Sequence, residues 1–243
     1  MNRVLAWFSC GAASAYSAKL AIDKYGDKCE VVYCDTLKYE HPDNKRFMKD
    51  CEKWFGKEIK LLKSEKYKDI YDVFDKTGWL VGPAGARCTT ELKKLVRRKY
   101  QEDDDIHVFG YTIEEKHRKK QLMIGEPELK CYFPLIECEI SKRGCLEALH
   151  KAGIEIPMMY RMGYANNNCI PCVKGGAGYF NRIKRDFPDS FHKMAIQERK
   201  MGIAILKKYV NGERVPLFLD ELPPDMGRMD AEPNIECGVL CLS

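Results

Sequence analysis

The stretch that decides the fold is Val4-Leu5-Ala6-Trp7-Phe8-Ser9-Cys10-Gly11-Ala12-Ala13-Ser14-Ala15-Tyr16-Ser17. Its apolar start, Val4 to Phe8, predicts a buried strand, and Ala15 to Tyr25 has the composition of a helix. The small residues between them, Ser9 to Ser14, predict a tight loop at a helix N-terminus. Backbone N–H groups are unpaired there and the helix dipole is positive, so a phosphate can bind at close range. The stretch therefore predicts a phosphate-binding loop, with an ordinary strand-to-helix turn as the alternative.

The next apolar segment supports a nucleotide ligand. Glu30-Val31-Val32-Tyr33-Cys34 reads as a second buried strand, and it is followed by the acidic Asp35 and the hydroxyl residue Thr36. In an open parallel sheet, ligands bind beyond the carboxyl ends of adjacent strands. One strand end suited to phosphate and a second suited to ribose together predict a nucleotide pocket.

Composition sets the broad class of the protein. The chain has 243 residues, of which 32% are charged and 45% hydrophobic, with a net charge of +5. That length suits one large α/β domain with a small appendage, and the charge fits phosphate-bearing ligands without establishing nucleic-acid binding. No apolar run approaches the length of a membrane span, and Met1-Asn2-Arg3 leads directly into the first strand, so we expect no membrane partner and a cytoplasmic location.

Strands and helices alternate along the first two thirds of the chain. Further strands are predicted at Ile59–Leu62 and 106–110, and helices at 44–55, 67–77, 91–100 and 141–151. This alternation predicts an α/β fold, a three-layer, doubly wound and mostly parallel sheet, over residues 1–165. Residues 166–243 are predicted to be a helical, cysteine-bearing region, helical over 179–209 with a break at Phe187-Pro188, followed by an irregular tail.

Several segments, in order, resemble the phosphoadenylyl-sulfate (PAPS) reductases of the adenine nucleotide α-hydrolase superfamily. The phosphate loop corresponds to residues 9–14, the second-strand motif to 34–42, and a cysteine motif to 85–89. The later half corresponds to 110–118, 132–136, 156–164 and 169–172. Each motif is weak alone, and their order carries the resemblance. It implies the superfamily's fold and a nucleotide site made by Ser9, Cys10, Gly11, Ala12, Ser14, Asp35, Thr36, Gly110 and Tyr111.

The chain also departs from the patterns of these enzymes. Ala13 stands where the ATP pyrophosphatases of the superfamily have Asp, and Arg87 precedes Cys88, so the tandem cysteines of iron–sulfur adenylyl-sulfate reductases are absent. The reductases carry a nucleophilic cysteine in a C-terminal Glu-Cys-Gly-Leu/Ile-His motif. Glu236-Cys237-Gly238-Val239 matches its first part, without the His. The resemblance implies Cys237 as nucleophile, with Arg118 and Lys174 supplying positive charge.

Twelve cysteines are unusual for a chain expected in a reducing compartment, where structural disulfides are rare. Cys29, Cys34, Cys51, Cys138 and Cys145 lie in or beside apolar segments and are predicted to be buried. Cys169-Ile170-Pro171-Cys172 has a spacing that suits soft metals, and Cys88 is expected at the start of a helix. We expect Cys88, Cys169 and Cys172 to converge on a 4Fe–4S cluster, either with one iron open or with a fourth ligand from Cys131, Cys237 or Cys241. Zinc and a redox dithiol are the alternatives.

Two reactions fit these residues. In the first, a cysteine thiolate attacks the sulfonate of PAPS or adenylyl sulfate (APS), and a thioredoxin-like thiol donor completes the reduction. In the second, ATP adenylylates an oxygen of a nucleobase or nucleic-acid substrate, and sulfur from a cysteine or cluster displaces AMP. A third reading is a nucleotide-binding protein without catalysis. The Glu-Cys-Gly tail and the missing Asp favour the reductase.

Overall fold

The first strand lies at the centre of the molecule. In the computed structural model, which describes residues 2–82 and 85–228, β1 (Val4–Phe8) is buried along its whole length. It pairs in parallel with β2 (Cys29–Cys34) on one side and with β6 (Ile106–Val108) on the other. A strand with apolar residues on both faces suits this position, because both faces of a parallel sheet are covered by helices.

The described residues form one all-parallel sheet of five strands in the order β3-β2-β1-β6-β7. Strand β3 (Ile59–Leu62) lies at one edge and β7 (Lys130–Tyr132) at the other. The chain moves outward from β1 to β3 and then returns to add β6 and β7 on the opposite side. The α/β doubly wound fold is therefore confirmed, and the point where strand order reverses lies between β1 and β6. Strand β7 was not predicted.

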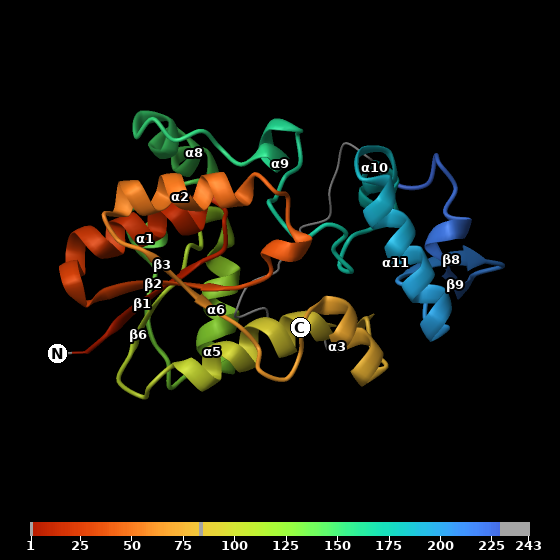
Figure 1. Cartoon of the computed structure of the whole chain (residues 1–243), viewed down its shortest axis with the longest axis horizontal. Coiled ribbons are helices and arrows are strands. Elements are labelled where there is room, and N and C mark those ends of the chain that lie inside the picture. The colour runs from red at the N-terminus through yellow and green to blue at the C-terminus, as the bar shows by residue number, and fades with distance from the viewer. Residues whose placement is uncertain (1, 83–84, 229–243) are drawn as a thin grey trace.

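Helices cover both faces of the sheet, which gives the three layers visible in Figure 1. On one face, α1 packs against β1, α2 and α8 around an apolar core containing Phe8, Phe47 and Leu149. On the other face, α5 and α6 contribute Val96 and Leu122 to a smaller core with Leu5 and Phe133. The bounds of the helices that cover the sheet are α1 Ala12–Tyr25, α2 Asn44–Phe55, α5 Leu95–Tyr100, α6 Lys116–Gly125, α7 Pro134–Glu137 and α8 Lys142–Lys151.

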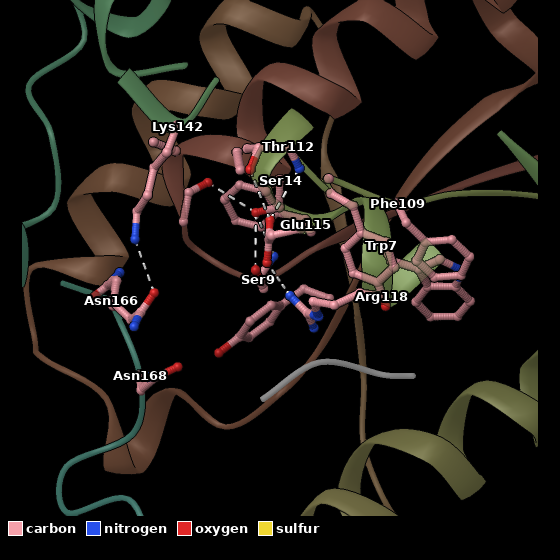
Figure 2. A pocket seen from close by; sticks show the side chains of 18 of the residues that line it. Trp7, Ser9, Ser14, Phe109, Thr112, Glu115, Arg118, Lys142, Asn166 and Asn168 are labelled. Carbon is pink, nitrogen blue, oxygen red and sulfur yellow. Dashed lines mark hydrogen bonds and ion pairs between the residues drawn. The ribbon is translucent and has the colours of Figure 1, made fainter. Parts of the chain in front are cut away.

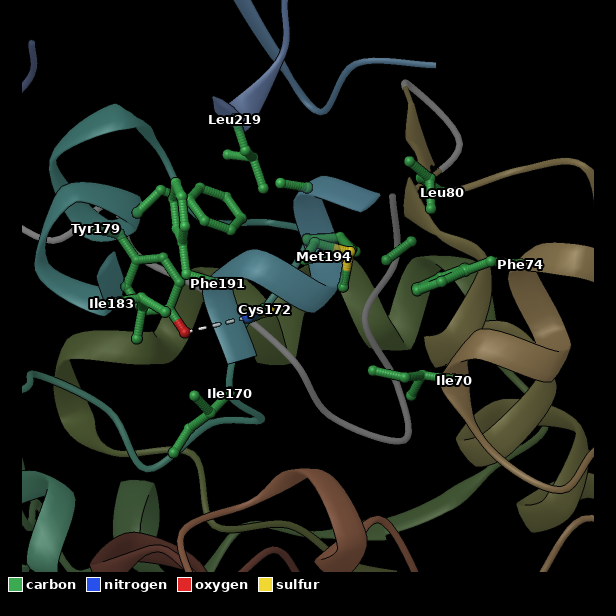
Figure 3. Close-up of a cluster of buried hydrophobic side chains, with 14 of the residues drawn as sticks. Ile70, Phe74, Leu80, Ile170, Cys172, Tyr179, Ile183, Phe191, Met194 and Leu219 are labelled. Carbon is green, nitrogen blue, oxygen red and sulfur yellow. Dashed lines mark hydrogen bonds between the residues drawn. The ribbon is translucent and has the colours of Figure 1, made fainter. Parts of the chain in front are cut away.

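A third apolar core lies beside the sheet domain. It joins residues from 67–92 to residues from 159–222, and Figure 3 shows Phe74 facing the cluster formed by Phe191, Met194 and Leu219. This core draws on both sides of the predicted domain boundary at residue 165. Its elements are α3 Ile70–Thr77, β4 Val81–Gly82, β5 Gly85–Ala86, α4 Arg87–Thr89, the π-helical turn Thr90–Lys94, α9 Met158–Arg161, α10 Ala177–Asp186, α11 Pro188–Met201, β8 Leu206–Val210 and β9 Glu213–Leu217.

Three details of the predicted secondary structure are wrong. Helix α1 begins at Ala12 and not at Ala15, so part of the small-residue run is already helical. The helix predicted to continue to residue 209 ends at Met201, where Gly202 adopts a left-handed conformation. The chain then forms the antiparallel β8–β9 hairpin, part of which was expected to be irregular. The sequence did not reveal this stop, because apolar and polar residues alternate only weakly in β8 and its composition also suits a helix.

Candidate functional site

A cavity of about 430 Å³ opens at the carboxyl ends of β1 and β6, where the strand order reverses. Its wall combines the β1–α1 loop, the segment that leaves β6, the start of α6, and the segment 166–169. Reversal points in doubly wound sheets leave such a crevice because the two neighbouring crossovers run in opposite directions. The cavity therefore shares the end of β1 with the predicted pocket, but its second strand end is that of β6 and not that of β2 with Asp35 and Thr36.

The β1–α1 loop is held in shape by Ser14. The Ser14 hydroxyl donates to the carbonyl of Gly11 at 3.0 Å and accepts from the backbone N–H of Ser9 at the same distance. Cys10 has a φ of +54°, a left-handed conformation that is uncommon for a non-glycine residue. The N-terminus of α1 has no side-chain cap and no acidic residue in its first turn, so its positive dipole faces the cavity uncompensated by a carboxylate.

Two close contacts hold neighbouring segments against this loop. A Cβ atom on Gly110 would stand 2.8 Å from the backbone of Ala13 and Ser14, so only glycine allows the β6 exit to approach α1 this closely. On the other side, a Cβ on Gly11 would stand 3.3 Å from the hydroxyl of Tyr160. Burial raises the pKa of Tyr160 to about 12, while hydrogen bonds with the backbone of Ala12 and Asn167 act in the opposite direction. The Tyr160 phenol is therefore neutral and fixed beside the helix N-terminus.

Arg118, which is held in place by an ion pair with Glu115, presents positive charge to the cavity. Arg118 lines the cavity, its guanidinium lies 4.3 Å from the centre of the Tyr111 ring, and it forms an ion pair with Glu115. Glu115 in turn accepts hydrogen bonds from the backbone N–H and the hydroxyl of Thr112, at 3.1 and 3.2 Å. Figure 2 shows Thr112, Glu115 and Arg118 as one connected group that points toward the cavity. Further basic side chains line the cavity: Lys93, His117 and Lys142.

A cluster of aromatic rings, almost fully buried in the core under α5 and α6, lies beside the arginine. Trp7, Phe109 and Tyr111 line the cavity, and Phe109 stacks on Tyr111 with ring centroids 5.9 Å apart. Figure 2 shows Trp7 and Phe109 together at one side of the pocket, behind Arg118. Flat apolar rings next to a cationic group can stack with a planar base while the cation pairs with an anion.

A buried polar network supports the opposite wall. The carboxylate of Glu40 is almost fully buried and accepts from the hydroxyls of Tyr33 and Thr36 at 2.7 and 2.6 Å, and from the amide of Asn44 at 2.7 Å. The network continues from Asn44 to Asn167, whose amide nitrogen also donates to the carbonyl of Cys10. It joins the end of β2, the start of α2, the phosphate loop and the segment 166–169.

Only some of the predicted nucleotide residues line the cavity. Those that do are Ser9, Gly11, Ala12, Ser14, Gly110 and Tyr111. Cys10 instead packs in the sheet core, and burial raises the pKa of its thiol. Asp35 accepts from the backbone N–H of Leu37 and lies 3.4 Å from the amine of Lys63, and Thr36 is buried in the Glu40 network. The end of β2 reaches the cavity through Tyr33 and Cys34.

The predicted catalytic residues are divided in the same way. Arg118 lines the cavity, whereas Lys174 is not among the residues that do. Cys237 and Cys241 lie outside the described residues. Among the lining residues that the sequence did not assign to the site are Glu40, Lys93, Lys142 and Tyr160. Asn166, Asn167 and Asn168 also line the cavity. This asparagine triplet before Cys169 predicts hydrogen bonds to cluster sulfurs or to substrate, with turn formation as the alternative.

The cysteines lie in different environments. Of the five predicted to be buried, Cys29, Cys34, Cys51 and Cys145 are buried and Cys138 is exposed, so that prediction is wrong for Cys138. It stands at the end of the short helix α7, where its apolar neighbours do not cover it. Cys34 lines the cavity, but burial raises its thiol pKa to about 12, which makes it a poor nucleophile.

The predicted metal ligands lie near one another in the fold without forming a ligand set. Cys169 lines the cavity, Cys172 is buried in the third core, beside the sheet domain, and Cys88 packs against that core. The Tyr179 hydroxyl bridges the Cys-x-x-Cys turn, because it donates to the carbonyl of Cys169 and accepts from the N–H of Cys172 (Figure 3). Within residues 2–82 and 85–228, no three His, Cys, Asp or Glu side chains are placed to hold a metal ion. The iron–sulfur cluster and the zinc alternative therefore remain predictions.

Two comparisons of the sequence with known proteins give no match. A scan against protein-family models found no family, and a search of curated proteins found no relative. In the described part of the chain, none of the helices has the length and apolar character needed to cross a membrane. The argument for function rests on the cavity and on the residues around it.

Proposed function

We propose that the chain binds an adenine nucleotide in the cavity at the β1–β6 reversal and is a PAPS-reductase-like enzyme of sulfur metabolism. The observation that carries the proposal is the meeting of three features in one cavity of about 430 Å³. These are a helix N-terminus bordered by small residues, the arginine held by Glu115, and the cluster of aromatic rings beside it. The cavity is of the size that small-molecule sites occupy.

The phosphate end of the nucleotide would lie at the N-terminus of α1. The first N–H groups of that helix have no intrahelical partners, and small side chains leave them accessible. Ser14 fixes the loop from inside and leaves the hydroxyl of Ser9 at its rim. The base would lie against the small parts of Trp7, Phe109 and Tyr111 that reach the cavity wall, since the rest of these rings is buried in the core.

Arg118 is the residue best placed to recognise a second anionic group. It is 13% exposed, and the ion pair with Glu115 fixes its orientation before any ligand binds. A guanidinium can donate two parallel hydrogen bonds to a sulfonate or phosphate, so an arginine held in this way favours a nucleotide with an extended anionic end. Glu115 acts through Arg118 and is a positioning residue.

The proposed reaction is a two-electron reduction by thiols. A cysteine thiolate attacks the sulfonate sulfur, a new S–S bond forms, and the S–O bond to the nucleotide phosphate breaks. The phosphate leaves with the bonding electron pair. A thioredoxin-like dithiol then reduces the S–S bond, releases sulfite and becomes a disulfide. Arg118 would stabilise the charge that develops on the leaving phosphate. Cys237 is the proposed nucleophile.

One observation favours the second candidate function, an ATP-dependent sulfurtransferase. Cys169 is a partly exposed thiol in the cavity wall, beside the amides of Asn166 and Asn168. Figure 2 shows both asparagines on the wall opposite Arg118, and neutral amides suit a nucleobase or another uncharged acceptor better than they suit a sulfonate. A thiol at this place, loaded as a persulfide by a sulfur donor, could attack an adenylylated acceptor through its outer sulfur and displace AMP, after which a second thiol would cleave the S–S bond and release the thiolated product.

Binding measurements test the shared part of both functions. Isothermal titration calorimetry should detect PAPS, APS or ATP, and GTP should bind more weakly if the base is recognised. Gly11→Asp places a carboxylate at the helix N-terminus and should abolish binding, because the residue approaches Tyr160 and the anion position together. Arg118→Ala should weaken binding of the sulfonucleotides about tenfold to hundredfold, since a hydrogen bond to a charged group is lost. Gly144→Ala, in helix α8 and outside the residues that line the cavity, is the matched control.

The reaction itself distinguishes the two candidates. A reductase should release sulfite from PAPS or APS with thioredoxin, and Cys237→Ser should still bind nucleotide but form no S-sulfo adduct by mass spectrometry. Turnover by Cys237→Ser at the wild-type rate would exclude the reductase mechanism. Release of AMP or pyrophosphate from ATP only when a nucleobase acceptor is added would instead support the sulfurtransferase. Absence of binding by every adenine nucleotide would refute both.

A further inference from the structure

Asn167 occupies a special position in the cavity wall. It lines the cavity, yet only 7% of its surface is exposed, and it is separated by 157 residues from the phosphate loop that it contacts. Its neighbours Asn166 and Asn168 also line the cavity, and Figure 2 shows them on the same stretch of chain. Of the three, Asn167 is the most deeply buried, so its polar atoms have the fewest solvent partners.

The amide nitrogen of Asn167 is fully committed to the protein. It donates to the carbonyl of Cys10 at 2.7 Å and to the amide oxygen of Asn44 at 2.8 Å. Asn44 uses its own amide nitrogen to donate to the buried carboxylate of Glu40. Both partners of Asn167 are acceptors, so its amide nitrogen, and not its amide oxygen, must face them. The network therefore fixes the orientation of the amide group. The NH₂ group thus faces Cys10 and Asn44, and the oxygen lies on the other side.

The amide oxygen of Asn167 has no hydrogen-bond partner among the described residues and is buried. Buried acceptors without a donor are rare in native proteins, because the oxygen has lost water and gained nothing in exchange. The network cannot satisfy it by rotation, since a rotated amide would place its oxygen against the carbonyl of Cys10. A donor from outside the chain, supplied when the cavity is filled, would satisfy it.

We infer that Asn167 is a specificity-determining residue whose amide oxygen accepts a hydrogen bond from a ribose hydroxyl of the bound nucleotide. The inference rests on the proposed nucleotide function. The ribose is favoured over the exocyclic amine of adenine because Asn167 directly contacts the phosphate loop. In a nucleotide whose phosphate lies at that loop, the sugar hydroxyls are the donors nearest to it, whereas the amine lies at the far end of the base.

A comparison of ligands in two proteins tests the inference. Titrations of the wild type and of Asn167→Ala use ATP, 2′-deoxy-ATP and 3′-deoxy-ATP. In the wild type, loss of the recognised hydroxyl should weaken binding at least about tenfold, because the buried oxygen is left without a donor. In Asn167→Ala, the deoxy and ribo ligands should bind within about twofold of each other. A purely structural asparagine would weaken all three ligands equally and keep the wild-type ratio.

Two control variants separate the hydrogen bond from general damage to the loop. Asn168→Ala changes a neighbouring amide in the cavity wall and should keep the wild-type ratio between ribo and deoxy ligands. Asn44→Ala removes a partner of Asn167 without touching the cavity, so it should weaken all ligands together. If Asn167→Ala does not fold, Asn167→Ser removes the same oxygen with a smaller loss of volume, and urea unfolding establishes that each variant is native.

The outcomes are distinct from those that test the proposed function. Wild-type protein that binds ATP but shows the same ribo-to-deoxy ratio as Asn167→Ala overturns the inference and leaves nucleotide binding intact. Purine riboside triphosphate lacks the 6-amino group of ATP. If Asn167→Ala abolishes the affinity difference between these two ligands instead of the difference between ribo and deoxy ligands, the assignment to ribose is overturned. Wild-type protein that binds none of these nucleotides overturns the proposed function and the inference with it.

Discussion

Replacing Gly110 by alanine is the sharpest test of how the site is built. Gly110 follows β6 and approaches the first turn of α1 so closely that an added Cβ would stand 2.8 Å from the carbonyl carbon and oxygen of Ala13 and from the Cα of Ser14. All three atoms belong to backbone, so no side chain can rotate out of the way. The substitution must displace either the β6 exit or the N-terminus of α1.

The size of the displacement follows from the distances. Ordinary contact begins near 3.4 Å, so the two segments must separate by about 0.6 Å. Overpacking of a tight contact typically costs about 1–3 kcal/mol. For a chain of this length, each kcal/mol lowers the melting temperature by about 2–4 °C, so Gly110→Ala should lower it by about 2–12 °C. The phosphate loop shares the displaced turn, so nucleotide affinity should fall by about tenfold or more.

Urea unfolding measures the stability and calorimetry with ATP or PAPS measures the affinity. Gly144→Ala serves as the control, because its Cβ would meet side chains and no backbone, Ile140 at 3.2 Å and the Ser141 hydroxyl at 3.6 Å, and alanine is the better helix former. The control should be neutral or slightly stabilising and should leave affinity unchanged. The reasoning is refuted if Gly110→Ala matches the wild type in both measurements, because the close approach would then not be a feature of the molecule in solution.

Three further substitutions probe buried polar groups. Glu198 is buried without a cation within bonding distance among the described residues, and desolvation raises its pKa from 4.5 to about 7. Its contribution to stability is therefore complete below pH 4.5 and is lost as the pH rises through 7, by up to about 3 kcal/mol, and Glu198→Gln should flatten that part of the profile of unfolding free energy against pH. Tyr33→Phe removes one of three donors to Glu40 and should cost about 1.5–3 kcal/mol in urea unfolding, whereas an unchanged midpoint would show that the network does not need it. Arg3→Ala leaves the carboxylate of Asp105, which is 2% exposed, without its two hydrogen bonds of 2.8 and 2.9 Å, and should cost about 2 kcal/mol or more at pH 7. That penalty should shrink as the pH falls and Asp105 becomes protonated, since the arginine lowers the pKa of Asp105; a penalty independent of pH would contradict the ion-pair explanation.

The sequence was sufficient for the main features of the sheet domain. An apolar run of five residues followed by small residues identified β1 and the loop before α1, and the alternation of strands and helices predicted the parallel sheet. These features are local, because they depend on which residues prefer a buried strand or a helix and on the restricted handedness of crossovers. The position of the cavity followed only in part, because the sequence placed it at the end of β1 but not beside β6.

The composition of the site depended on contacts between distant segments. Asp35 and Thr36 follow a strand that reaches the cavity, but Thr36 bonds to Glu40 and Asp35 bonds to its own turn, so neither lines the wall. Glu40 and Asn167 became neighbours of the phosphate loop only because α2 and the segment 166–169 pack against it. No periodicity encodes such pairings, because they are made by single side chains, and the bonds of Asn167 to Cys10 and Asn44 join residues more than a hundred positions apart. The sequence by itself determined the parallel sheet and the small-residue loop before α1, whereas the tertiary structure decided the strand order, which polar atoms are paired or buried, and which side chains face the cavity.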